Sequence, residues 1–359
     1  MAVTIRDVAK RAGCSVATVS RALNQSGPVR ADTRRRIEEA VAEMKYRPNV
    51  AARSLITRRT GMLGVLLPDL HGEFFSELIR GLDDAAQAHG YHLLLSSSHD
   101  LAEELEAALH GMQGRVDGLV IMAPKLDAAT LNALLPRSTP VVLLNSPHAR
   151  ASVCDLRIDN YGGASSMVSH LASHGHKRIA IITGPTGNHD AEERLTGYRN
   201  ALAEAGIECD PALEIEGDFR TSSGYHATNL LLALADRPSA IFAANDAMAL
   251  GALSALRDAG VAVPGDIALA GFDDLSSTRY SIPPLSSVHV SISELGARAI
   301  ASLSEVVANG APPVEPHEVL SATAVLRRSC GCAGRDGERR AQPTEPAHRG
   351  SHPTQEDRP

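Results

Sequence analysis

The sequence predicts a multi-domain protein in which a small all-α head precedes a larger α/β body. At 359 residues the chain is too long for one ordinary domain. The first 60 residues place apolar side chains at helical spacing, whereas from Gly61 onward short apolar runs alternate with helical patterns. The sign of the charge changes at the same point. Residues 1–59 are basic, with 13 Lys and Arg against 5 Asp and Glu, whereas the whole chain has a net charge of −7, so the remainder is acidic. The basic head is therefore expected to meet a polyanion and the acidic body to avoid one.

The head is predicted to form three short helices. Thr4 is a candidate N-cap of the first helix, which Gly13 ends, and Ser15 is a candidate N-cap of the second. A third helix is expected over about 32–45, before the break at Tyr46-Arg47-Pro48-Asn49. A helix, a tight turn containing glycine and a second helix are the signature of a helix-turn-helix motif.

In such a motif the second helix inserts its N-terminal residues into the major groove of DNA. Val16, Ala17 and Arg21 are expected to face outward on that helix. Arg21 has the geometry to donate two hydrogen bonds to guanine O6 and N7, and Val16 and Ala17 suit the methyl group of thymine. The competing interpretation is that Val16 is a core residue and Arg21 a solvated surface arginine.

The body is predicted to contain parallel sheets covered by helices on both faces, because near-continuous apolar strands alternate with helical patterns. The two doubly wound halves are expected near 61–158 and 159–284. A helix around 293–309 and a strand around 318–327 then need partners in those sheets. The predicted strands lie at about 62–67, 91–96, 117–122, 140–145, 178–183, 213–217, 239–244 and 267–272.

Polar residues interrupt the apolar runs where several predicted strands end. Asn145, the pair Asn245-Asp246 and Asp273 each follow a strand directly. In open α/β sheets, ligands bind at the carboxyl ends of the strands. Carboxylates and amides at that edge suit the hydroxyl groups of a sugar. Three residues after the first strand are also candidates to line this site: Asp69, His71 and Glu73.

Known enzyme motifs are missing from the sequence. No Gly-Lys-Ser/Thr follows the glycine-rich segment 184–187, no G-x-S-x-G is present, and the 15 histidines show no metalloprotease spacing. We therefore expect no catalytic activity and no cofactor. A secreted solute-binding protein would share the body, but it would carry a signal peptide in place of the basic head.

The five cysteines are odd in number and scattered, which favours a reducing, cytoplasmic environment over a disulfide framework. Cys330 and Cys332 are separated by one residue, which is tighter than the usual spacing of metal ligands, so no metal site is expected. The chain has no apolar stretch long enough to span a bilayer, and we expect no membrane contact. Residues 329–359 are predicted to be a disordered tail, because they are polar and aperiodic.

Residues 3–55 resemble the DNA-binding head of the LacI/GalR (lactose-repressor) family. The segments that carry the resemblance are VTIRDVAKRAGCSVATVSRALN, VRADTRRRIEEAVAEMKYRPN and AARSL. Cys14 stands where the family more often has Val. The resemblance implies a helix-turn-helix domain over 1–48 and a hinge over 49–60 that folds on the minor groove. It also implies a transcriptional regulator of the repressor type that binds a pseudo-palindromic operator as a homodimer.

The resemblance further implies a role for each matching residue of the head. Val16, Ala17 and Arg21 match the major-groove readers, and Leu55 matches the hinge leucine that kinks the duplex. The other hinge positions are Asn49 and Ala52. The positions that match phosphate contacts are Thr4, Ser15, Thr18, Ser20, Asn24 and Tyr46; such contacts set register without reading sequence.

The resemblance continues to about residue 328 and implies a body like that of periplasmic sugar-binding proteins. Its lobes would comprise 61–158 plus 288–317 and 159–287 plus 318–328, with an effector between them. A sugar is the favoured effector, ahead of a nucleobase or nucleoside, and its action as inducer or corepressor stays open. The residues that match effector contacts are Phe75, Asn145, Arg194, Phe219, Asn245 and Asp273; several relatives carry Asp in place of Asn145.

Overall fold

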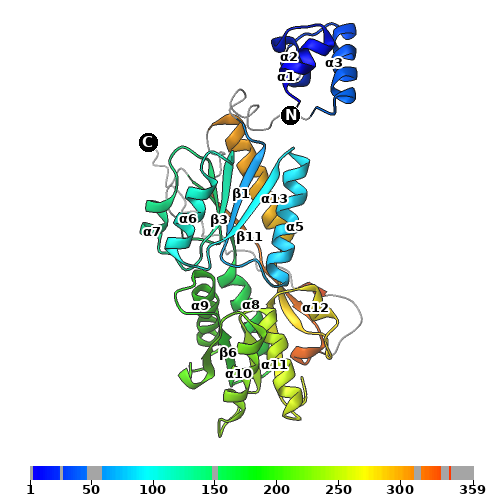
Figure 1. Cartoon of the computed structure of the whole chain (residues 1–359). Coiled ribbons are helices and arrows are strands. Elements are labelled where there is room, and N and C mark those ends of the chain that lie inside the picture. Colours follow the sequence, from blue (N-terminus) through cyan, green and yellow to red (C-terminus); the bar gives the residue numbers. More distant parts are fainter. Residues whose placement is uncertain are drawn as a thin grey trace, which may run out of the picture. The chain divides into compact units, whose positions relative to one another are not determined.

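The computed structural model describes residues 3–24, 27–46, 59–147, 153–310, 317–332 and 339–340. The chain divides into two compact units, Met1–Gly61 and Met62–Pro359 (Figure 1). The first unit is helical, and the second contains two sheets flanked by helices. None of the helices in the described part of the chain combines the length and apolar character that a membrane span requires.

The head folds as three helices, α1 (Ile5–Ala12), α2 (Val16–Asn24) and α3 (Ala31–Glu43). Both predicted N-caps are present. The Thr4 hydroxyl accepts the Asp7 backbone N–H at 3.4 Å while the Asp7 carboxylate accepts that of Thr4 at 2.9 Å. Gly13, at φ 61°, ends α1, and the Ser15 hydroxyl accepts the Thr18 N–H at 3.1 Å. The helices enclose a small core of Val8, Ala9, Ala12, Val19, Ala22, Ile37 and Ala40.

The first sheet of the body is parallel throughout, in the order β11-β5-β4-β3-β1-β2. Side chains alternate between its faces, so Val65 belongs to one core cluster and Leu66 to another. Its strands are β1 (Met62–Leu67), β2 (His92–Ser97), β3 (Gly118–Met122), β4 (Val141–Leu144), β5 (Cys154–Ile158) and β11 (His317–Leu320). Helices α5 (Glu73–Ala88) and α13 (Ile292–Asn309) cover one face, and α6 (Ala102–Met112) and α7 (Ala128–Leu134) the other.

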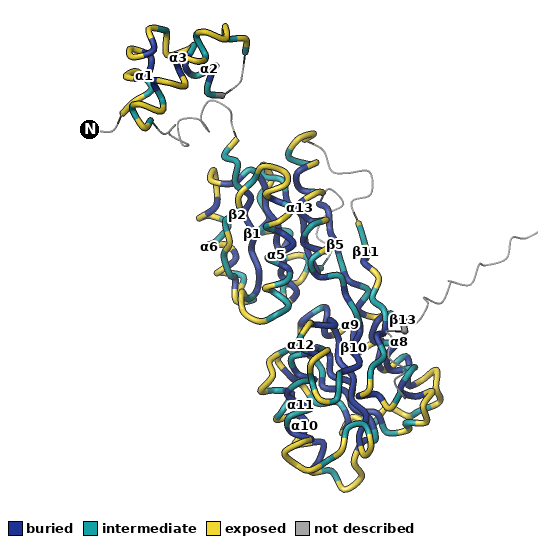
Figure 2. The backbone as a smooth tube through the Cα atoms, turned by 90° about the vertical axis from the view of Figure 1, so that its right-hand side faces the viewer, coloured by how far each residue is buried: buried dark blue, intermediate teal, exposed yellow. Residues whose placement is uncertain are grey.

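The second sheet has the order β13-β12-β10-β9-β8-β6-β7, and within it β12 runs antiparallel to both of its neighbours, β10 and β13. Its strands are β6 (Ile179–Thr183), β7 (Glu214–Glu216), β8 (Ala240–Ala243), β9 (Ala268–Asp273), β10 (Ser286–His289), β12 (Thr323–Leu326) and β13 (Arg339–Arg340). Its helices are α8 (Asn160–Ser173) and α9 (His189–Glu204) on one face, α10 (Thr221–Leu232) and α11 (Asp246–Asp258) on the other, and the short α12 (Ser276–Arg279). Figure 2 shows that in both lobes the central strands of the sheet are buried and the outer faces of the helices are exposed.

The eight strands predicted from apolar runs are all present, and the two-sheet α/β body is confirmed. Strand β5 was not predicted, because Asp155 and Arg157 interrupt its apolar pattern. Those side chains are tolerated since they form an ion pair at 2.7 Å, and β4 and β11 flank the strand on both sides.

The chain passes between the sheets three times, after β5, after β10 and after β11. The single strand expected around 318–327 is in fact two strands in different sheets, since β11 pairs with β5 and β12 pairs with β10. The lobe boundaries expected after residues 287 and 317 therefore lie a few residues too early. The crossover at Ser321-Ala322 was missed because one serine, without a glycine or proline beside it, is only a weak turn signal between two apolar runs.

The disordered tail expected over 329–359 is wrong for its first residues. Ser329 and Cys330 are fully buried in the short 3₁₀ helix η2 (Arg328–Cys330). The Ser329 hydroxyl donates to Leu269 O at 2.6 Å and accepts the Ser286 N–H at 2.7 Å. Compositional reasoning fails here because a few specific hydrogen bonds, with no periodic pattern, attach this segment to β9 and β10. Gly331, Cys332 and β13 are the other described residues of the expected tail, and its remaining residues lie outside the described part of the chain.

Candidate functional sites

A buried arginine organises the polar residues at the carboxyl ends of the second sheet. Arg194 lies on α9 and is 4% exposed. Its Nε donates to Asn160 Oδ1 at 2.9 Å, its Nη1 donates to the Ala244 carbonyl, and its guanidinium lies 3.8 Å from the centre of the Phe272 ring. A cation removed from water in this way needs partners on every side, because an unpaired buried charge is very costly.

Two buried carboxyl groups face this arginine. Asp273 Oδ1 lies 3.6 Å from Arg194 Nη2, close enough for attraction but too far for a hydrogen bond, and within the described residues it accepts none. Asp190 accepts a hydrogen bond from Asn160 Nδ2 at 3.0 Å. Burial raises the pKa of Asp273 to about 7 and that of Asp190 to about 6, although Arg194 opposes both shifts. Near neutral pH this cluster therefore has both donors and acceptors to offer a polar ligand.

Three of the predicted effector residues have strained backbones. Asn145, Phe219 and Asp273 have φ of 39°, 66° and 106°, in the region that non-glycine residues rarely adopt. Such strain concentrates at functional sites, where the surrounding structure holds it in place. Asn145 belongs to the same cluster, because its Oδ1 accepts the Ile158 N–H at 3.1 Å while a hydrogen bond from its side chain opposes the rise that burial causes in the pKa of Asp190.

The side chain of Asn245 is committed to the protein itself. Its Oδ1 caps α11 by accepting the Met248 N–H at 2.9 Å, and its Nδ2 donates to the Phe219 carbonyl at 3.0 Å. Phe219 in turn lies with its ring centre 5.9 Å from the Arg194 guanidinium, and a Cβ on Gly184 would lie 2.2 Å from the ring. Asn245 therefore positions Phe219 beside the cluster.

Phe75 lies in the first turn of α5, in the first lobe. It packs edge-on against Phe74 with ring centres 5.3 Å apart, and it contacts the main core cluster. These contacts suit a core residue, so its stacking on a ligand remains a prediction.

The other candidates after β1 join the two lobes. The Glu73 carboxylate accepts hydrogen bonds from the hydroxyls of Ser276 and Ser277, on α12 in the second lobe, at 2.5 and 2.6 Å. Asp69 accepts the N–H of His71 at 3.0 Å and lies 3.9 Å from Arg220 of the second lobe. The His71 side chain itself is almost fully exposed. Glu73 thus acts as a latch between the lobes.

Sequence reasoning missed Asn160 and Asp190 and left the role of Asp246 open. Asp246 is fully buried and accepts the Leu275 N–H at 2.8 Å and the Ser287 hydroxyl at 2.6 Å, which secures the turn after Asp273. Burial raises its pKa well above the usual value. Asn160 and Asp190 also follow strands, β5 and β6, so the strand-end rule would have found Asn160 had β5 been predicted.

A surface pocket of the second lobe lies elsewhere, lined by residues that include Lys177, Arg178, Cys209 and Asp210. These residues precede β6 and β7, so the pocket is at the amino ends of the strands. The Arg194 cluster is the better candidate site, because it lies at the carboxyl ends, where open α/β sheets bind ligands, and because it has strained and unpartnered groups.

In the head, the predicted reading surface faces outward. Val16 is 40% exposed, and Ala17 and Arg21 are also exposed. The structure therefore excludes Val16 as a core residue. Arg21 Nε donates to the Ala17 carbonyl at 3.3 Å, a weak contact that involves only one of its three nitrogens.

The residues expected to hold phosphates are spread over the head: Ser15, Thr18, Ser20 and Asn24 lie on or directly before α2, Thr4 precedes α1, and Tyr46 follows α3. The hydroxyls of Ser15 and Thr18 share a 2.8 Å hydrogen bond, Thr4 caps α1, and Tyr46 packs on the core of the head. Ser20 is half-buried on α2, and Asn24 ends that helix. The three hinge positions, Asn49, Ala52 and Leu55, lie outside the described residues.

Comparison with known proteins agrees with both parts of the chain. Residues 4–49 match the model of bacterial regulatory proteins of the lacI family, and residues 168–330 match a periplasmic binding protein-like domain. The chain is 36% identical over 332 residues to the HTH-type transcriptional repressor PurR of Edwardsiella ictaluri, covering 91% of this chain and 96% of that protein. It is 35% identical to catabolite control protein A of Priestia megaterium, covering 85% and 92%.

Solved structures show the same architecture. The lac repressor dimer bound to operator and the anti-inducer ONPF matches with a TM-score of 0.85 and 30% identity, over 92% of this chain and 99% of that one. The complex of the transcriptional regulator CelR with cellobiose matches with a TM-score of 0.68 and 32% identity, over 91% and 99%. The head, the two-lobed body and identities sustained over nearly the full length lead to one conclusion: the chain belongs to the lacI family of bacterial regulatory proteins.

Proposed function

We propose that this protein represses transcription by binding a pseudo-palindromic operator as a homodimer, and that a small polar effector bound at the Arg194 cluster modulates that binding. The observation that carries the DNA-binding part is the exposed face of α2, with Val16, Ala17 and Arg21 facing outward on a strongly basic head. A protein that regulates transcription in this way acts in the cytoplasm, at the nucleoid, and needs no catalytic cofactor.

The homodimer follows from the size of one reading helix. A single recognition helix reads only a few base pairs, whereas two copies related by a twofold axis read two half-sites about one helical turn apart. The proposal assigns base reading to Val16, Ala17 and Arg21 and minor-groove binding to the hinge residues Ala52 and Leu55. A wedge at the operator centre costs unstacking energy, which the contacts of two hinges together offset.

The effector is proposed to act through the orientation of the two lobes. Glu73 latches onto α12 across the lobe boundary, and the polar cluster lies on α8, α9 and β9 of the second lobe. A ligand that binds one lobe arrangement more tightly shifts the population toward it. By linkage, the factor by which the ligand changes operator affinity equals the factor by which the operator changes ligand affinity.

A sugar is the effector class that the cluster supports best. Asp273, Asp190 and Asn145 supply carboxyl and amide groups, Arg194 supplies donors, and Phe219 supplies an apolar ring face. Sugars need such paired donors and acceptors with an aromatic surface. The CelR relative was solved with cellobiose, which agrees with this choice.

Selection of binding sites from a pool of random duplexes tests the DNA-binding part. The full chain should enrich a twofold-symmetric sequence, and it should sediment as a dimer at working concentration. A monomer that binds no duplex at moderate salt would overturn the proposal.

A thermal-shift screen of monosaccharides, disaccharides, nucleobases and nucleosides tests the effector. A ligand raises the melting temperature by mass action, and the shift with a sugar should disappear in Asp273→Asn. A shift with nucleosides alone would replace the sugar, and shifts that persist in Asp273→Asn would move the site elsewhere. Adding the ligand to the operator complex then shows the sign of regulation.

A further inference from the structure

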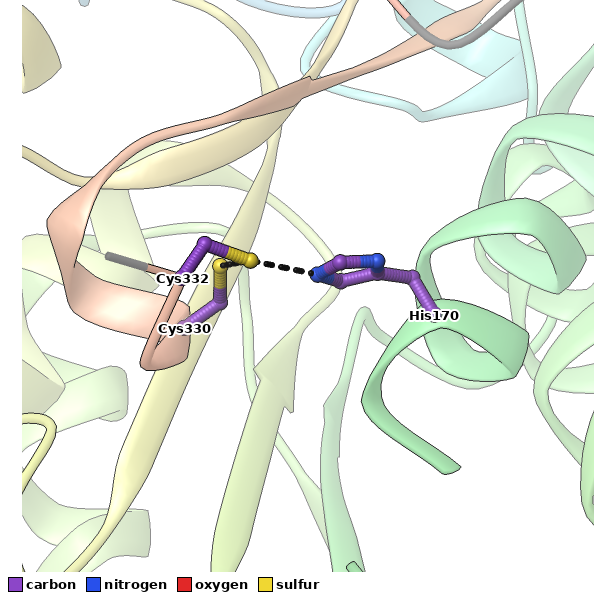
Figure 3. A group of neighbouring side chains, drawn as sticks. All are labelled: His170, Cys330 and Cys332. Atoms are coloured by element: carbon purple, nitrogen blue, oxygen red, sulfur yellow. Dashed lines mark hydrogen bonds between the residues drawn. The ribbon is translucent and has the colours of Figure 1, made fainter. Parts of the chain in front are cut away.

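A second cluster, far from the effector residues along α8, brings together two cysteines and a histidine. Nε2 of His170 lies 3.2 Å from Sγ of Cys332, which lies 3.2 Å from Sγ of Cys330 (Figure 3). These three atoms all lie within 4.8 Å of one another. Cys330 is fully buried, and His170 and Cys332 are half-buried.

A fourth donor stands one helical turn further along α8. Nε2 of His174 lies 3.7 Å from Sγ of Cys332, and the two imidazole rings are 4.5 Å apart between centres. Histidines four residues apart on a helix share one face. The group therefore offers two sulfur and two nitrogen donors from two segments of the chain.

We propose that His170, His174, Cys330 and Cys332 form a structural site for one Zn²⁺ ion in the second lobe. Two thiolates with two imidazoles are a common tetrahedral ligand set for zinc. Bonds of about 2.3 Å to sulfur and about 2.0 Å to nitrogen hold tetrahedral donors roughly 3.3–3.8 Å apart. The separations from Cys332 Sγ to the other three donors are 3.2 to 3.7 Å, so side-chain adjustments bring the group to that geometry.

The conformation of Gly331 overcomes the objection that one intervening residue is too few. Gly331 has φ 85°, a left-handed conformation that turns the chain sharply between the two cysteines. Both sulfurs consequently face the same helix, as Figure 3 shows. The η2 helix, which ends at Cys330, is fixed by buried hydrogen bonds of Ser329, so this part of the site is held in place before any ion binds.

The thiols need not be ionised beforehand, because a bound Zn²⁺ ion itself displaces the protons of the cysteines that coordinate it.

The ion would join the segment after β12 to α8, the helix that begins with Asn160 in the effector cluster. The effect of the ion is therefore structural, because it would hold in place the segment that follows β12, the first strand after the third crossover. Effector or operator binding is not needed for it, so this site and the proposed function can be tested apart.

Cobalt substitution in the full-length protein tests the site directly. The reduced, chelator-treated chain is titrated with Co²⁺, which should produce thiolate-to-cobalt absorption and the visible bands of a tetrahedral ion at one ion per chain. Zn²⁺ should abolish these bands at one equivalent. Reduced protein that shows no such bands would overturn the proposal, as would a pair that stays oxidised as a disulfide under mild reductant.

Variants assign the ligands, and Cys330 is avoided because it is fully buried. Cys332→Ser and His170→Gln should lose the sulfur-cobalt bands, and His174→Gln should weaken binding at least tenfold. Cys209→Ser removes an exposed cysteine, and His348→Ala with His352→Ala removes two histidines near the C-terminus, so both controls should bind normally.

Zn²⁺ should raise the melting temperature by about 5 °C in the wild type and not in Cys332→Ser. Equal binding by Cys332→Ser, or loss in either control, contradicts the assignment.

Discussion

The reading surface on α2 and the polar cluster around Arg194 are built in opposite ways. On α2 the side chains of Val16, Ala17 and Arg21 are exposed and make few contacts with their own chain. In the body, Arg194 and Asp273 are almost fully buried, and they interact with each other as an ion pair while Arg194 also donates a hydrogen bond to Asn160. In the head, the residues proposed to read DNA therefore contribute little to the stability of the fold. In the cluster, the residues proposed to bind the effector also stabilise the fold. Substitutions on α2 should change binding alone, and substitutions in the cluster should change folding as well.

The largest effect is expected from Arg194→Met. Removing the guanidinium leaves Asp190, Asp273 and Asn160 buried without their cation, which should lower the free energy of unfolding by about 3–5 kcal/mol. Urea unfolding measures the loss. Arg199→Met is the matched control on the same helix, because Arg199 is 53% exposed and its ion pair with Glu214 should contribute less than about 1 kcal/mol. Equal losses in both variants would contradict the central place of Arg194.

Asp273→Asn should change the pH dependence of stability. Because burial raises the pKa of Asp273 to about 7, the native state binds more protons than the unfolded state between about pH 4 and 7. The contribution of Asp273 to the stability of the wild type therefore falls as pH rises through that window. The asparagine of the variant does not titrate and makes no such contribution. The melting temperature of the variant, measured relative to that of the wild type, should therefore rise between pH 5 and pH 7.5.

Asp84→Asn, at an exposed position on α5, serves as the control for this comparison. Its difference from the wild type should stay constant over the same range. If the Asp273→Asn difference is just as flat, the cluster does not hold a proton in the way that its burial implies.

Arg21→Ala should affect DNA binding without affecting stability. Loss of a bidentate contact to guanine costs about 1–3 kcal/mol of discrimination at one base pair, and the melting temperature should not change. Arg35→Ala is the control, since Arg35 is 72% exposed and pairs with Asp32 on its own helix. Competition with operator variants measures the effect, and a uniform loss over all sequences would make Arg21 a phosphate contact.

The smallest effect is expected at the latch between the lobes. Glu73→Gln keeps the shape of the side chain but removes the charge that strengthens its hydrogen bonds to Ser276 and Ser277. We expect a change of about 1 kcal/mol, or roughly fivefold, in the effector dissociation constant measured by calorimetry. Glu77→Gln, one turn along α5, should change nothing, and equal behaviour of the two variants would remove the latch from the mechanism.

Much of the architecture was predictable because its signals are local. Thr4 and Ser15 cap their helices as their residue types predict, and eight apolar runs form strands. The carboxyl ends of parallel strands lie along one edge, so the meeting of Asp273 with other polar residues was also predictable. β5 was missed because Asp155 and Arg157 break the apolar pattern that the prediction relied on. The commitment of Asn245 to helix capping was missed because the same residue type suits a cap and a ligand contact equally well.

The sequence by itself determined the elements, the basic head and the approximate edge of the effector site, because hydrophobic periodicity and capping act over a few residues. The tertiary structure alone decided which sheet each half of 317–326 joins and which side chains surround Arg194. It also brought His170 to Cys332 across 162 residues of sequence. That contact depends on the path of the chain through the third crossover and on the buried hydrogen bonds of Ser329, and no spacing along the sequence encodes either.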